Sequence, residues 1–308
     1  MRTNLPYPRA IQLVRDAYKA LALGKAENPD RAILRVPGGA SMFFMPGYVH
    51  GRKYVVMKAA RMNPENSRQS LPTIVSTVYV YDFQTGVQAA EVEAELLTMI
   101  RTAASTAVAT DFLARRDVKI LGIFGSGREA LAHIAALLEV RDFERVLVYS
   151  RNLERREMFA KEMTDRHGIP VKAAGSAEEA ARKSDVIVSA TTSQTPVFEG
   201  TIVMKGSTVN AIGNAVPEGR EIDTKLVERS SLVVDSHSQA LTTYGDIIKP
   251  IKENAIQASE ILELGDLLIG KAKLPSQRDV TLFKSGGLAV LDAIVVEHIL
   301  DSMPHGNR

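Results

Sequence analysis

The sequence predicts an α/β protein in which a doubly wound parallel sheet is inserted into a smaller α+β domain. After Asp117, short apolar strands alternate with helical segments, which is typical of a parallel sheet. Before Asp117, strand-like runs follow one another and end in a hairpin. A last helix from Ser285 carries apolar residues along one stripe, and we expect it to return to the first domain. The predicted domains are therefore residues 1–116 with 286–308, and residues 117–285.

The first domain is expected to open with a helix over 10–23, because Ile11, Val14, Tyr18 and Leu21 recur at helical spacing. Strand-like runs follow at 32–36, 41–45, 54–59 and 73–81. The turn at 82–86 leads into a further run at 87–92, which together predict a hairpin. A long helix rich in small residues is expected from about 95 to 116.

The second domain has six apolar runs that predict strands. They lie at 118–124, 145–150, 171–174, 185–190, 208–212 and 232–235. Between the third and fourth, Ser176 and Glu179 form the pattern of a capping box, which predicts a short helix.

Composition excludes several classes of protein. The chain has 308 residues, 45% of them apolar, and a net charge of +2, so a nucleic-acid partner has no support. No run is long enough to predict a membrane span, and the first residues lack the apolar core of a secretion signal. Cysteine is absent and the six histidines have no ligand spacing, so we predict no metal site and a cytoplasmic protein.

A glycine motif stands between the strand at 118–124 and an amphipathic helix. It comprises Gly125, Ser126, Gly127, Arg128, Glu129 and Ala130. Gly125 permits a tight turn, Gly127 lets the backbone approach a pyrophosphate at the helix N-terminus, and Ala130 lets the helix pack closely on the strand. The motif in this context predicts a Rossmann-type dinucleotide-binding domain.

The end of the next strand bears on the choice of cofactor. NAD sites usually place an acidic residue there for the ribose hydroxyls, whereas this chain has Ser150, Arg151 and Asn152, followed by Arg155 and Arg156. A hydroxyl and a guanidinium suit a 2′-phosphate, which a carboxylate would repel. We therefore predict NADP(H) as the preferred cofactor and NAD(H) as the second choice.

Three isolated cations in the first domain are candidates for binding an anion. Lys58 interrupts an apolar strand, Arg101 lies near the start of the long helix, and Arg31 follows Asp30. A buried ammonium needs a partner, and a guanidinium near a helix start favours a bound carboxylate. Taken alone, each residue fits a surface charge or an internal salt bridge better.

Four further segments carry a family resemblance. They are Arg101 to Ala104, which reads RTAA; Asn63 to Asn66 after Lys58; Val209 to Gly213 with Pro217 and Glu221 beyond; and Thr281 to Ala289 with Asp292. In this order around a nucleotide motif, the sequence resembles the ornithine cyclodeaminase/mu-crystallin family over nearly its whole length.

The resemblance implies a homodimer whose first domains pair, and it implies roles for particular residues. Arg31, Lys58 and Arg101 would converge on a substrate carboxylate, with Lys58 near the reacting atoms and Met45 lining the pocket. The cofactor side would include Thr191, Thr192, Ser193, Ile212, Lys284 and Ser285.

The chain departs from the family pattern at two places. Deaminating members carry an Asp two residues after the glycine of the NAIG segment, where this chain has Ala215. A methyl group cannot move the proton that loss of ammonia requires. The start of the chain also lacks the family's first short strand. This difference affects the expected edge of the dimer interface but not the expected chemistry.

These features favour an NADPH-dependent reductase of small cyclic α-imino acids, such as Δ1-pyrroline-2-carboxylate or Δ1-piperideine-2-carboxylate. One alternative is an ornithine cyclodeaminase or amino-acid dehydrogenase whose acid is displaced to Glu218, Glu221 or Asp223. Another is a non-catalytic, NADPH-dependent protein that binds a small ligand, as mu-crystallin relatives are thought to do.

Overall fold

The computed structural model describes residues 5–36, 40–63, 65–66, 71–72, 74–275 and 278–303. The chain divides into unit 1, Met1–Thr102 with Gly287–Arg308, and unit 2, Ala103–Gly286. The division falls inside the long helix α2 (Ala94–Leu113) and between two glycines. The predicted strand start at Thr73 and Pro64 of the 63–66 segment lie outside the described residues.

Unit 1 is built on an antiparallel sheet in the order β1-β3-β4-β5-β6, with β2 also paired to β3. Its strands are β1 (Ala26–Glu27), β2 (Ala32–Arg35), β3 (Ser41–Val49), β4 (Tyr54–Met62), β5 (Ile74–Asp82) and β6 (Gln88–Glu93). Helix α1 (Tyr7–Ala22) begins after Pro6, which suits a helix start because proline lacks the N–H that a first turn leaves unused.

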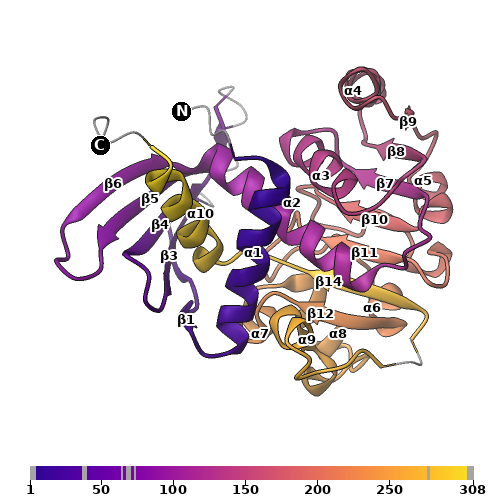
Figure 1. Ribbon diagram of the computed structural model, residues 1–308. Helices are drawn as coiled ribbons and strands as arrows, with labels where there is room; N and C mark the ends of the chain where they lie inside the picture. Colours follow the sequence, from indigo (N-terminus) through magenta and orange to yellow (C-terminus); the bar gives the residue numbers. More distant parts are fainter. Residues whose placement is uncertain are drawn as a thin grey trace. The chain divides into compact units, whose positions relative to one another are not determined.

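Helix α10 (Ala289–Asp301) packs on β3, β4 and α1 within unit 1 (Figure 1). It starts at Ala289 and not at the predicted Ser285, because Gly287 has a φ of +85°, which is incompatible with an α-helix. A Cβ on Gly47 of β3 would lie 2.6 Å from the backbone of Ala289 and Val290. Only glycine therefore permits this close approach of strand and helix.

Unit 2 is built on a parallel sheet in the order β13-β12-β14-β11-β10-β7-β8-β9. Its strands are β7 (Ile120–Phe124), β8 (Arg145–Tyr149), β9 (Val171–Ala173), β10 (Val186–Ser189), β11 (Thr208–Ala211), β12 (Ser230–Val234), β13 (Leu262–Glu263) and β14 (Val280–Lys284). Its helices besides α2 are α3 (Arg128–Leu138), α4 (Leu153–His167), α5 (Ala177–Lys183), α6 (Thr224–Glu228), α7 (His237–Thr242), α8 (Gly245–Lys252) and α9 (Leu264–Leu268). The strand order reverses at β7 and β10, where doubly wound sheets bind their ligands.

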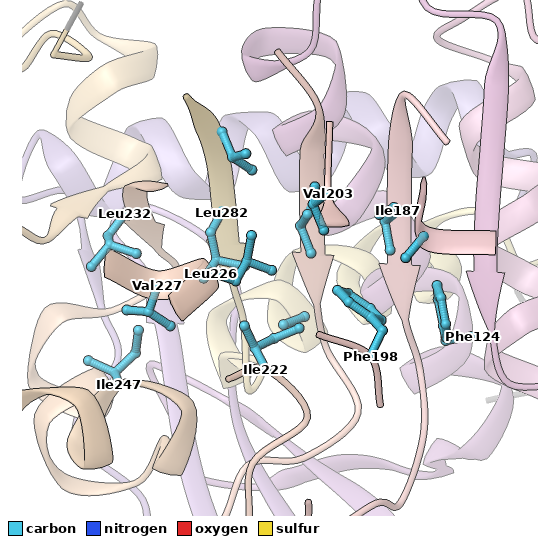
Figure 2. Packing of buried hydrophobic residues seen from close by; sticks show 14 of the residues in the cluster. Phe124, Ile187, Phe198, Val203, Ile222, Leu226, Val227, Leu232, Ile247 and Leu282 are labelled. Carbon is cyan, nitrogen blue, oxygen red and sulfur yellow. The ribbon is translucent and has the colours of Figure 1, made fainter. Parts of the chain in front are cut away.

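One large apolar core cluster of unit 2 lies on one face of this sheet. Figure 2 shows Ile187 and Leu282 of the sheet with Leu226 of α6 and Ile247 of α8 in this core. Asn210 of β11 points the other way, as alternation in a strand requires, and its Nδ2 donates to Thr110 Oγ1 of α2 at 3.2 Å. Helices therefore cover both faces of the sheet.

Strand β14 and the short helices α6 to α9 were not predicted as elements. Residues 280–284 do not stand out as a strand in the sequence, because Thr281 and Lys284 interrupt the apolar run. The short helices span five to eight residues, too few for a helical period to stand out. Among the described residues, no helix has the length and hydropathy to cross a membrane.

Candidate functional site

Two buried cations of unit 1 converge on one carboxylate oxygen. Lys58 Nζ donates to Asp292 Oδ1 at 3.0 Å and to Thr98 Oγ1 at 2.5 Å, and Arg101 Nε donates to the same Oδ1 at 3.3 Å. Lys58, Arg101 and Asp292 are 3%, 5% and 0% exposed. We refer to these three residues as the cation cluster.

The cation cluster carries an excess of positive charge. One carboxylate faces one ammonium and one guanidinium, which leaves a net charge of +1 in a region shielded from water. Buried charges are costly unless they are compensated, and Asp292 supplies part of that compensation. An arginine and a lysine side by side also provide charged hydrogen-bond donors that bind a small carboxylate well.

Sequence reasoning singled out Lys58 and Arg101 but missed the roles of Thr98 and Asp292. Asp292 lies in the first turn of α10, where the helix dipole stabilises a negative charge. Its neighbours in that helix are almost all apolar. An acid inside the otherwise apolar run 288–296 was the signal that could have identified it.

Arg31 and Met45 also lie in unit 1. Arg31 Nη2 donates to the carbonyl oxygen of Gly287 at 3.0 Å. A Cβ on Gly287 would collide with the guanidinium of Arg101, so Gly287 lies against both arginines. Met45 of β3 is buried and pairs directly with Lys58 of β4. Of the four residues expected at the substrate, Met45 and Lys58 thus pair at the centres of β3 and β4, and Arg31 and Arg101 lie at Gly287, just before α10.

The glycine motif of unit 2 has the geometry that a pyrophosphate needs. Gly125 has a φ of +119°, and a Cβ there would lie 2.7 Å from the carbonyl oxygen of Ala190. Gly127 is the N-cap of α3, no side chain caps that helix, and an added Cβ would meet nothing within 4 Å. Open space in front of uncapped N–H groups fits a bound phosphate.

The other residues of the motif differ in exposure. Arg128 is exposed, Ser126 and Glu129 are partly buried, and Ala130 is fully buried against the sheet. Ser126 Oγ donates to Ser150 Oγ at 3.0 Å, which joins the glycine turn after β7 to the turn after β8.

The residues at the turn after β8 are of two kinds: some hold the turn together and others are exposed. Arg156 Nη1 donates to the carbonyl oxygen of Ser150 at 2.9 Å, and its guanidinium lies 4.9 Å from the ring centre of Tyr149. Asn152 Oδ1 accepts from Arg155 N at 2.8 Å and so caps α4. Arg151 is exposed at the turn. Arg156 shapes this turn, whereas Arg151 remains accessible to a ligand.

The loop after β10 carries the three predicted hydroxyl residues. Thr192 is exposed, while Thr191 and Ser193 are partly buried. Thr191 Oγ1 accepts from Ser193 N at 3.1 Å, which gives the loop a tight local shape. Ile212 follows β11 and is buried, with its N–H donated to the carbonyl oxygen of Ser189 at 2.9 Å.

Lys284 and Ser285 are engaged inside unit 2. Lys284 is fully buried, its Nζ lies 2.7 Å from Asp246 Oδ2, and it donates to the carbonyl oxygen of Asn214. Ser285 Oγ donates to Asp235 Oδ2 at 2.7 Å. Both side chains hold strand ends together, so we expect them to act on a cofactor through the loops they fix.

Two of the three acids of the cyclodeaminase alternative, Glu221 and Asp223, occupy structural positions. Asp223 caps α6 by accepting from Leu226 N at 2.8 Å, and Glu218 is exposed. Glu221 is fully buried. Burial raises the pKa of Glu221, and the nearby charge of Lys284 opposes this effect.

Ala215 is partly buried and packs against the apolar core of unit 2. The position where deaminating relatives are expected to carry an acid therefore serves packing in this chain.

His133 is the histidine most affected by its surroundings. It is fully buried, its Nδ1 donates to the carbonyl oxygen of Glu129 at 2.7 Å, and its Nε2 accepts from Thr106 Oγ1 at 3.0 Å. Burial lowers its pKa to about 4, so the ring is neutral. No group of three or more potential metal ligands occurs among the described residues.

The profile of the ornithine cyclodeaminase/mu-crystallin family matches residues 3–307 of the chain. The Δ1-pyrroline-2-carboxylate reductase of Bacillus thuringiensis subsp. konkukian is 37% identical over 295 residues, which cover 92% of this chain and 90% of that enzyme.

Among solved structures, the Δ1-pyrroline-2-carboxylate reductase of Thermococcus litoralis in complex with NADH and L-proline has a TM-score of 0.93 at 37% identity. The similarity covers 97% of this chain and 94% of that one. An archaeal alanine dehydrogenase dimer with bound NAD has a TM-score of 0.90 at 29% identity, over 96% and 91% of the two chains. These similarities confirm the predicted fold class.

Proposed function

Because the chain belongs to the ornithine cyclodeaminase/mu-crystallin family, we propose that it is a nicotinamide-dependent reductase of small cyclic α-imino acids. The proposed substrates are ketimines such as Δ1-pyrroline-2-carboxylate and Δ1-piperideine-2-carboxylate, which yield proline and pipecolate. The similarity to reductases from Bacillus and Thermococcus, the second of which holds NADH and L-proline, supports this reaction.

The cation cluster is the observation that carries the proposal. A ketimine acid presents one carboxylate beside one C=N bond. Arg101, together with Arg31, would bind the carboxylate, and Lys58 would face the nitrogen. The ammonium and the guanidinium beside Asp292 are the donors that a small carboxylate binds well.

The reaction adds two electrons and two hydrogens to the C=N bond. When bound, NAD(P)H supplies a hydride, which goes to the carbon. Lys58 would donate the proton to the nitrogen, so that ketimine, NAD(P)H and one proton give the amino acid and NAD(P)+. Thr98 and Asp292 hold the Lys58 ammonium in place, and a positioned donor of this kind contributes roughly 10²–10⁴-fold to a rate.

We propose NADP(H) as the preferred cofactor. Support comes from the turn after β8, where Ser150, exposed Arg151 and Asn152 present no carboxylate to a 2′-phosphate. NADH in the Thermococcus relative makes NAD(H) the alternative that a measurement must compare.

We also propose the division of labour between the two parts of the chain. Residues 1–116 with 286–308 would bind the substrate and form a homodimer, and residues 117–285 would bind the dinucleotide. The dimer of the alanine dehydrogenase relative supports the oligomeric state.

A cyclodeaminase or amino-acid dehydrogenase is the second candidate, favoured by family membership, by the alanine dehydrogenase relative and by similarity to a solved lysine cyclodeaminase. Deamination needs a mobile proton donor, and Ala215 has none. Glu221 is buried and Asp223 caps a helix, which leaves neither placed for that work.

The proposal is tested with two reactions and one binding measurement on the purified chain. We expect NADPH oxidation that depends on Δ1-pyrroline-2-carboxylate, and little or no ammonia from ornithine. Conversion of ornithine to proline and ammonia without net use of cofactor would favour the cyclodeaminase. Tight binding of NADPH without turnover of any ketimine would favour a non-catalytic binding protein.

A further inference from the structure

Five donors converge on the carboxylate of Glu221, and they come from two neighbouring strand ends. Oε1 accepts hydrogen bonds from Ser189 Oγ at 2.7 Å, Thr191 N at 2.8 Å and Thr191 Oγ1 at 2.6 Å. Oε2 accepts from Gly213 N at 2.8 Å and Asn214 N at 2.9 Å. Because Ser189 ends β10 and Gly213 follows β11, one side chain ties both loops together.

These two loops also lie against each other and against the glycine turn after β7. A Cβ on Gly213 would collide with the backbone of Thr191, and a Cβ on Gly125 would lie 2.7 Å from the carbonyl oxygen of Ala190. β7, β10 and β11 are parallel neighbours, and their carboxyl ends meet at the edge where such sheets bind nucleotides. Any displacement of loop 190–193 would therefore change the surface that receives a dinucleotide.

A second buried acid anchors Glu221 itself. Asp246 Oδ1 accepts hydrogen bonds from Glu221 N at 2.7 Å and Ile222 N at 2.9 Å. Asp246 Oδ2 lies 2.7 Å from Lys284 Nζ, at the end of β14. Glu221, Asp246 and Lys284 are all fully buried. The network therefore connects the carboxyl ends of three adjacent strands.

We propose that Glu221 is a positioning residue for the nicotinamide cofactor, which holds loops 190–193 and 212–214 in the shape that the dinucleotide binds. Its oxygens are occupied by donors and enclosed by protein, so it acts through the loops and not by touching the cofactor. The inference rests on the proposed function for the identity of that cofactor.

Glu221→Gln tests this role with almost no change in side-chain volume. The amide replaces one oxygen by an NH2 group, so buried N–H or O–H donors of one loop lose their acceptor. We expect the Kd for NADPH and for NADH to rise about tenfold or more, because the loop must then leave its present position. Both values are measured by titration of cofactor fluorescence on the full chain.

Asp185→Asn is the matched control. Asp185 Oδ2 accepts from Lys119 N at 2.8 Å and Ile120 N at 2.9 Å, so it joins strands at the opposite, amino-terminal edge of the same sheet. The control should lower the Tm, as Glu221→Gln should, yet leave both cofactor Kd values unchanged. A merely structural role of Glu221 predicts that both variants lose stability and neither loses affinity.

Ser189→Ala provides a second variant that removes one donor and keeps Glu221. Ser189 is fully buried in β10, so its hydroxyl affects the loops only through the Glu221 carboxylate. We expect a rise in Kd of about threefold, and no further rise when this change is added to Glu221→Gln. If Glu221→Gln does not fold, the cofactor Kd of Ser189→Ala alone tests the positioning role.

Parent Kd values in folded Glu221→Gln and Ser189→Ala, or equal losses of affinity in Asp185→Asn, would overturn the inference. If the parent chain binds neither NADPH nor NADH, the proposed function fails and this inference fails with it. Binding by the parent with unchanged variants overturns the positioning role alone.

Discussion

Lys58 Nζ and Asp292 Oδ1 lie 3.0 Å apart, although 234 positions separate the two residues in the sequence. The same oxygen also receives Arg101 Nε at 3.3 Å. Asp292 therefore brings both cations of the cluster to one oxygen. The cluster is an arrangement of β4, α2 and α10 within unit 1, and its chemistry depends on the packing of α10 on the sheet.

Replacing Asp292 by Asn should destabilise the fold. The change removes the carboxylate that the buried ammonium and guanidinium both face, and breaking one side of a buried pair typically costs about 3–5 kcal/mol. Glu297→Gln is the matched control in α10, because Glu297 Oε2 lies 3.8 Å from the more exposed Arg52. That change should cost about 1 kcal/mol or less. The free energy of unfolding of both variants is measured with urea. Equal losses of stability in the two variants would contradict this account.

The two cations should have different kinetic roles. Arg101→Ala should raise KM strongly for the ketimine, because it removes a donor to the substrate carboxylate in ground and transition states alike. Lys58→Ala should lower kcat by roughly 10²-fold or more, because it also removes the proposed proton donor. Lys53→Ala removes an exposed charge next to β4 and should leave both constants unchanged. Parent kinetics in the Arg101 and Lys58 variants would show that both are structural charges.

Arg151 should account for most of the preference for NADPH. Arg151→Ala removes a charge-assisted contact worth about 1.5–3 kcal/mol, so NADPH should bind roughly 10- to 100-fold more weakly while NADH changes little. Arg166→Ala alters the same charge near the far end of α4 and should change neither value. Equal Kd values of the parent chain for the two cofactors would refute the predicted preference.

His133 should make stability depend on pH below neutrality. Its pKa is about 4 in the folded chain because of burial, against 6.5 for an ordinary histidine. Between pH 6.5 and pH 4, His133 is therefore protonated in the unfolded chain and neutral in the folded chain. The free energy of unfolding consequently decreases as the pH falls from about 6.5 towards 4. The difference of about 2.5 pKa units corresponds to about 3 kcal/mol.

Urea unfolding of the cofactor-free parent and of His133→Gln between pH 7 and pH 4 tests this prediction. The stability of the parent minus that of the variant should shrink by about 3 kcal/mol over the range. Subtraction removes the carboxyl groups that titrate in both proteins. A difference that does not vary with pH would show that His133 titrates in the folded chain as it does in the unfolded one.

Local patterns determined the architecture and the nucleotide motif. The alternation of strands and helices after Asp117 predicts a parallel sheet, and the turn from Gly125 to Gly127 predicts a phosphate-binding helix start. Both depend on neighbours within a few residues, because a strand needs an alternating or apolar run and a tight turn needs glycine. Segments too short to repeat the helical period of about 3.6 residues, such as α6 and α9, escape prediction for the same reason.

Only the tertiary structure decided which charges meet. The sequence left Lys58 and Arg101 as isolated cations, and the packing of α10 brings Asp292 to both. It left Glu221 as a candidate acid, and the adjacent ends of β10 and β11 surround it with five donors. Periodicity determines the face on which a side chain lies but not the distant element that covers that face. The partner of a buried charge therefore becomes known only when elements far apart in the chain have packed together.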